Sequence, residues 1–143
     1  MNISKEIIKI SAIVGAIFGF LALIPPFIFY ACLTLFLFSS IATVLYYRKF
    51  DSYELVDYNN TALNGGIIGF VSFFGFAVLF IPCVLILSLI FKNYYNYGLP
   101  YFLNLQALWL FILILVTVGI ICAVTNGVML MSVQLVDSFR KVK

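Results

Sequence analysis

The polar side chains in the last apolar segment of the chain, residues 103–136, have the clearest capacity for chemistry. Asn126 and Thr125 stand there among Ile, Val, Leu and Met. A carboxamide donates and accepts hydrogen bonds, and in hydrocarbon it must find its partners on neighbouring helices. The pair therefore either joins helices or lines a path for a small neutral solute or ion. The hydroxyl groups expected to share either role come from two other apolar segments: Ser39, Thr43 and Ser72.

Acid–base and metal chemistry has little support in this sequence. It contains no histidine, and no charged residue lies in the interior of an apolar segment. Cys32, Cys83 and Cys122 each stand alone in an apolar segment, so we expect them to pack as small apolar side chains. We therefore predict no catalytic residues, no cofactor and no metal site, and we expect that the protein is not an enzyme.

The composition is that of an integral membrane protein. Of the 143 residues, 65% are hydrophobic and only 9% are charged, whereas soluble domains contain about 25% charged residues. The mean hydropathy is +1.20. The net charge of +3 is too small to suggest binding to nucleic acid. The hydrocarbon of a membrane is the environment that accommodates so much apolar surface.

The apolar segments predict one domain, residues 1–143, with an all-α fold of four transmembrane helices. A helix needs about 20 residues to cross the hydrocarbon. Pro25 and Pro26 interrupt the first long apolar stretch, so we expect a tight helical hairpin there. The expected helices, packed as an antiparallel bundle, cover about 5–24, 27–47, 62–91 and 103–136.

The positions of the basic residues predict an orientation. With four spans, seven of the eight Lys and Arg residues fall on the side of the N-terminus, and only Lys92 falls on the other. Because cytoplasmic segments are enriched in basic residues, both termini should be cytoplasmic. The polar segment 48–61 then becomes a cytoplasmic loop, and residues 137–143 become a basic cytoplasmic tail.

Small residues recur at the four-residue spacing that lets membrane helices approach closely. Two such pairs, Gly15/Gly19 and Gly65/Gly69, are each followed by phenylalanine. A third stripe is formed by Gly119, Ala123 and Gly127. A homodimer contact or a pore lining would use such stripes, but packing inside one bundle explains them more simply. We therefore predict that these seven residues are helix-packing positions.

The overall layout resembles that of small uncharacterised four-span bacterial inner-membrane proteins. The similarity rests on the basic end of the second helix, Arg48-Lys49, and on the glycine-rich entry to the third, Asn64–Phe70. It implies a four-helix fold and a location in the inner membrane of a bacterium, but it transfers no functional residue.

Three functions are consistent with these observations. The first is a packing, interaction or accessory protein that contacts membrane lipid and belongs to a larger membrane complex or a homo-oligomer. The second is a small permease or channel for a neutral solute or ion, lined by the polar residues of the last helix. The third is a holin-like pore former.

Overall fold

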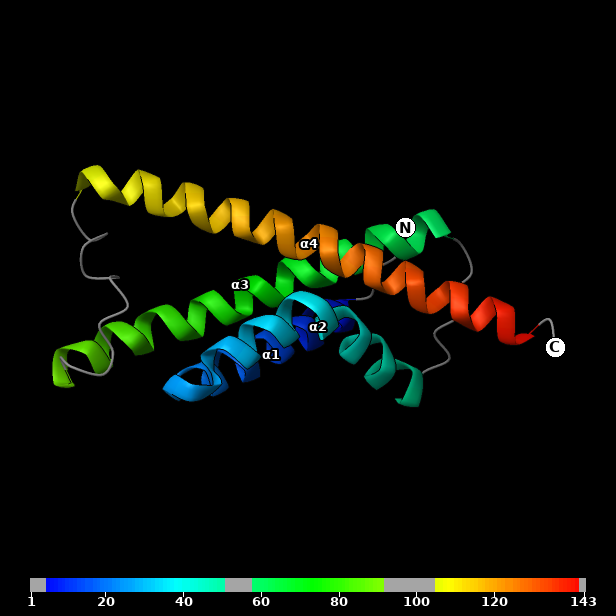
Figure 1. Ribbon diagram of the computed structural model, residues 1–143, viewed down its shortest axis with the longest axis horizontal. Coiled ribbons are helices and arrows are strands. Elements are labelled where there is room, and N and C mark those ends of the chain that lie inside the picture. The colour runs from blue at the N-terminus through cyan, green and yellow to red at the C-terminus, as the bar shows by residue number, and fades with distance from the viewer. Residues whose placement is uncertain (1–4, 51–57, 92–104, 142–143) are drawn as a thin grey trace.

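A computed structural model describes residues 5–50, 58–91 and 105–141 of the chain as four α-helices and one short 3-10 turn (Figure 1). The helices are α1 (Lys5–Ala22), α2 (Ile28–Phe50), α3 (Tyr58–Ile90) and α4 (Leu105–Lys141). The turn η1 (Pro25–Phe27) separates α1 from α2.

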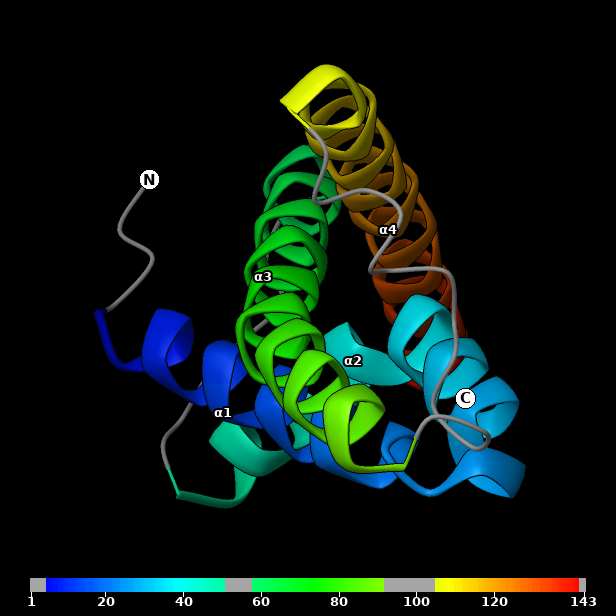
Figure 2. The same cartoon turned by 90° about the vertical axis from the view of Figure 1, so that its left-hand side faces the viewer.

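Successive helices run in opposite directions, so the start of α1, the end of α2, the start of α3 and the end of α4 lie toward one end of the bundle (Figure 1). Helix α3 packs against the three other helices, whereas α1 and α4 do not contact each other within the described residues. Figure 2 shows α3 between these two helices.

The two prolines determine where α1 ends. Ile24 precedes Pro25 and has an extended backbone, with φ −84° and ψ 112°, because a proline ring disfavours helical geometry in the residue before it. The amides of Leu23 and Ile24 close the last turn on carbonyls three residues earlier, at 3.2 Å each. Helix α1 therefore ends at Ala22, not at the predicted residue 24.

The other helix ends also differ from the predicted bounds. Helix α2 continues to Phe50 and α3 begins at Tyr58, so helices occupy both ends of the predicted loop 48–61. Helix α4 extends through most of the predicted tail, to Lys141. The predicted ends followed the loss of apolar residues, but Arg and Lys are good helix formers and continue a helix beyond an apolar segment. The predicted start of the last helix, residue 103, lies outside the described residues.

Three of the described helices are long and apolar enough to cross a membrane. The qualifying segments are Pro25–Tyr46, Asn60–Ile90 and Leu108–Val136. The apolar part of α1, Ile7–Ala22, is shorter; at 1.5 Å per residue it covers about 24 Å of a hydrocarbon layer about 30 Å thick. The structure thus agrees with the prediction of four helices, and three of them meet the requirement for a span.

Two apolar layers join all four helices. One contains Ala22, Leu35, Phe73 and Cys122, together with the side chains packed around them. Its rings include Phe76 and Phe80, stacked with centroids 5.0 Å apart.

The second layer consists of Ile7, Val44, Ile68 and Leu130, one from each helix. Several polar side chains are also buried in the bundle. One of them is Asn126, which is fully buried.

Candidate functional site

Asn126 is the centre of a buried polar cluster between α2 and α4. Its Oδ1 accepts hydrogen bonds from the Ser39 hydroxyl at 3.0 Å and from the backbone N–H of Ser40 at 2.9 Å. The Ser40 hydroxyl donates to the backbone carbonyl of Asn126 at 3.1 Å. All three residues are completely buried. We call Ser39, Ser40, Thr125 and Asn126 the Asn126 cluster.

The amide nitrogen of Asn126 bonds to the backbone of α2. Its Nδ2 donates to the carbonyls of Phe36 at 2.9 Å and Leu35 at 3.2 Å, and to Cys122 in its own helix at 3.0 Å. In a regular α-helix, the N–H of Ser40 donates to the carbonyl of Phe36. The Asn126 carboxamide bonds to both groups of this backbone pair.

Helix α2 bends near its middle, with its convex side toward α4 (Figure 1). Its sequence contains no proline or glycine, so neither of these residues causes the bend. A side chain inserted among the backbone hydrogen bonds is another known cause. The Thr43 hydroxyl, which donates to the carbonyl of Ser39 at 2.9 Å, adds a back-bond of the kind that favours bending.

Thr125 and Cys122 add contacts of α4 with α2 and α3. The Thr125 hydroxyl lies 2.9 Å from the carbonyl of Phe36 and 3.0 Å from that of Ile121. The Cys122 thiol is fully buried, and its sulfur lies 3.4 Å from the carbonyl of Gly69 in α3. The cluster therefore satisfies its polar atoms through contacts between helices.

The residues predicted as a polar lining do not form one surface. Thr125, Asn126 and Ser39 lie together, and Thr43 is joined to them through Ser39. Ser72 is also buried, but it lies at the contact of α3 with α1, where its backbone faces Gly15. Within the described residues, no group of three His, Cys, Asp or Glu side chains could hold a metal ion.

The predicted glycine positions lie at two helix contacts. At the first, between α1 and α3, a β-carbon added at Gly15 would collide with the backbone of Ser72. A β-carbon added at Gly19 would come within 3.0 Å of the carbonyl oxygen of Phe76. Gly75, which we did not include in the predicted set, faces the backbone of Ala12 in the same way. This reciprocal arrangement brings the two backbones together, which only glycine permits.

The second contact joins α3 to α4. A β-carbon added at Gly65 would lie 2.8 Å from the carbonyl oxygen of Asn126, and one added at Gly127 would lie 2.9 Å from that of Ala62. One added at Gly69 would lie 2.7 Å from both the Cys122 carbonyl oxygen and the Asn126 β-carbon. Farther along α4, Gly119 faces the rings of Phe70 and Phe73.

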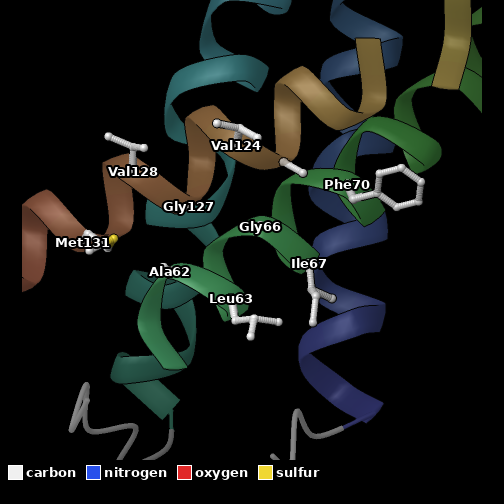
Figure 3. A pocket seen from close by; sticks show the side chains of 10 residues that line it. Ala62, Leu63, Gly66, Ile67, Phe70, Val124, Gly127, Val128 and Met131 are labelled. Atoms are coloured by element: carbon white, nitrogen blue, oxygen red, sulfur yellow. The ribbon is translucent and has the colours of Figure 1, made fainter. Parts of the chain in front are cut away.

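An open apolar groove runs along the outer side of this second contact (Figure 3). Its volume is about 730 Å³. Leu63 and Ile67 lie on one side of it and Val124 and Val128 on the other (Figure 3). The small residues lining the groove are Ala62, Gly66, Ala123 and Gly127.

Gly66 differs from its neighbour Gly65. A β-carbon added at Gly66 would meet a single atom within 4 Å, the carbonyl oxygen of Ala123, at an ordinary 3.5 Å. The packing of this chain therefore does not require glycine at position 66. Sequence reasoning noted Gly65 and Gly69 and missed Gly66, because adjacent residues point to different faces of a helix and the facing helix was not known.

Two residues near Asn126 were also missed as site residues. Ser40 was not predicted to take part, and Cys122 was predicted only as a small apolar side chain. The adjacent serines of α2 could have indicated the site, since two hydroxyls in one turn offer several bonds to an opposing carboxamide.

The neighbouring glycines provide a test of this geometry. We expect Gly65→Ala to lower the free energy of unfolding by about 1–3 kcal/mol, because its β-carbon would press on the backbone of α4. Gly66→Ala should be neutral or stabilise the helix by up to about 1 kcal/mol. Thermal unfolding of both variants in one detergent measures the difference, and equal midpoints would contradict the assigned faces.

Comparison of the chain with protein-family models, curated proteins and solved structures finds no match.

Proposed function

We propose that this protein is a non-catalytic helical-bundle protein of a bacterial inner membrane that binds a transmembrane helix of another protein along the groove between α3 and α4. It then acts as an accessory subunit of a larger membrane complex. The observation that carries the proposal is the open groove itself, which contains a glycine that the chain's own packing does not need.

A membrane location is supported by three helices that are long and apolar enough to span it. In the proposed arrangement α1 is the fourth span, and lysine side chains at its start reach the interface. The antiparallel order of the helices supports an orientation with both termini in the cytoplasm, because it brings all six basic residues of the described helices to one side. These residues are Lys5, Lys9, Arg48, Lys49, Arg140 and Lys141.

The small residues of the groove favour a helix over a lipid chain as its occupant. Helices associate in membranes where small residues let two backbones come close. A flexible acyl chain fills an apolar depression of any outline and gains nothing particular from glycine. Gly66 and Gly127 lie in the groove between its two rows of larger side chains (Figure 3), where the backbone of a docked helix would pass.

The alternative function, a permease or channel, has less support. It requires polar groups that remain available to a solute. The Asn126 carboxamide instead bonds to Ser39, to the backbone of α2 and to Cys122, and it is completely buried. The holin-like alternative rests on no contact among the described residues.

Site-directed photocrosslinking tests the proposed function. A photoreactive residue at Val124 faces the groove, whereas one at Val116 is exposed on the same helix outside it. In native membranes, we expect Val124 to give a discrete crosslinked polypeptide and Val116 to give lipid adducts. Gly66→Leu, which fills the groove, should remove the polypeptide product and leave the protein folded.

The products distinguish the possible occupants. A crosslinked species that contains a second polypeptide supports the proposal, and a band at twice the mass of the chain would identify that polypeptide as a second copy. Lipid adducts alone at both positions would contradict it, because the groove would then be an ordinary lipid-facing depression.

A further inference from the structure

We infer that the bend of α2 is a hinge controlled by Asn126: the carboxamide holds the Phe36–Ser40 backbone pair in the bent form, and its withdrawal lets that pair close and α2 straighten. This inference concerns the conformation of the bundle and goes beyond the proposed function. It rests on three observations: the bend, the absence of proline and glycine from α2, and the bonds of Asn126 to both members of one backbone pair.

The geometry of the insertion explains the direction of the bend. Asn126 approaches α2 from α4, so the added carboxamide spreads the backbone on that side. A helix that is spread on one side curves away from it. The observed bend has its convex side toward α4, as this requires (Figure 1).

In each of two states of α2, both backbone groups of the Phe36–Ser40 pair have a hydrogen-bond partner. In the bent state, the N–H of Ser40 donates to Asn126 Oδ1, and the carbonyl of Phe36 accepts from Asn126 Nδ2. In the straight state, these two backbone groups bond to each other, as in any α-helix. Neither state leaves a backbone group unpaired in hydrocarbon, where an unpaired group costs several kcal/mol. The straight state instead leaves the withdrawn carboxamide without its partners on α2, so the bonds of Asn126 favour the bent state.

The two halves of α2 are attached to different layers of the bundle. Ala31 and Leu35, before the bend, are buried in the layer that contains Phe76. Val44, after the bend, is buried in the layer with Ile68 and Leu130. Straightening α2 about its first half therefore moves Val44 relative to its layer and repacks the end of the bundle that contains the start of α1 and the end of α4.

Dipolar EPR between spin labels at Tyr30 and Leu45 measures the bend. Both side chains are exposed, and they stand 15 residues apart on opposite sides of the hinge. A straight helix separates their α-carbons by about 22 Å. Because a bend brings the two halves of a helix closer together, we expect a shorter distance in the otherwise unchanged protein. Asn126→Leu should lengthen it by several ångströms, toward the straight value.

Two matched variants separate the carboxamide from the hydroxyl groups around it. Ser40→Ala keeps the backbone N–H that bonds to Asn126, and Thr125→Val removes a hydroxyl that bonds to the Phe36 carbonyl but not to the Ser40 N–H. Both should keep the short distance.

The result that overturns the inference is a short distance retained in Asn126→Leu. A distance of about 22 Å in the protein with Asn126 intact would also overturn the inference. This second measurement does not depend on whether an Asn126 variant folds.

Discussion

Replacing Gly69 with leucine is expected to lower the free energy of unfolding in detergent by about 3 kcal/mol, the upper part of the range for overpacked positions. An added β-carbon would lie 2.7 Å from the Cys122 carbonyl oxygen and 2.7 Å from the Asn126 β-carbon. The first of these is backbone and cannot rotate away. The larger side chain of leucine must therefore push α4 from α3 and displace Asn126 from its partners on α2.

The matched control is the same substitution at Gly66, which lies three residues earlier and faces the groove. Because only the Ala123 carbonyl oxygen lies near its added β-carbon, Gly66→Leu should unfold at the temperature of the parent protein. Thermal unfolding followed by circular dichroism compares the two. Unchanged stability in Gly69→Leu would mean that α3 and α4 do not approach each other at this position.

The fold follows from the sequence wherever one segment is sufficient to determine it. The number of helices depends on apolar length, and the break before Pro25 depends on the geometry of one residue pair, so both could be derived without a structure. The end of α4 could not. Apolar length determines how much of a helix lies in hydrocarbon, whereas the helical backbone continues to Lys141, since no proline or glycine interrupts residues 137–141.

The candidate site shows the opposite situation, because it depends on how two helices face each other. That Asn126 must turn toward the bundle follows from the cost of an unsatisfied amide in lipid. Its partners depend on the rotation and offset of α2 against α4, and several hydroxyls of α2 were equally suitable. The bond to the backbone of Phe36 could not be predicted at all, since every residue has the same carbonyl group.

The difference between Gly65 and Gly66 also depends on how two helices face each other. Both are glycines at the start of one helix, and sequence spacing favours Gly65 because of its partner Gly69. Only the position of α4 shows that position 65 is closed and position 66 open. The assignment of a binding groove therefore required the structure, although the close approach of helices did not.

Replacing Asn126 with aspartate should also destabilise the protein strongly, by about 3 kcal/mol, the cost of a carboxylate at the centre of a membrane helix. The substitution keeps the size and shape of the side chain. Its second oxygen, however, takes the place of Nδ2, which donates to the carbonyls of Leu35, Phe36 and Cys122. Three attractive contacts thus become repulsions between oxygen atoms, in a site that excludes water.

Asn126→Leu is the control that separates charge from the loss of hydrogen bonds. Leucine removes every hydrogen bond of the side chain, but it brings no charge. The free energy of unfolding should fall less in this variant, by about 1–2 kcal/mol, as for the strongest polar contacts measured between membrane helices. Unfolding in detergent at neutral pH should rank the parent protein first, the leucine variant second and the aspartate variant last. An aspartate variant as stable as the parent would show that water or lipid headgroups reach position 126, and the permease interpretation would then regain support over that of a sealed, structural asparagine.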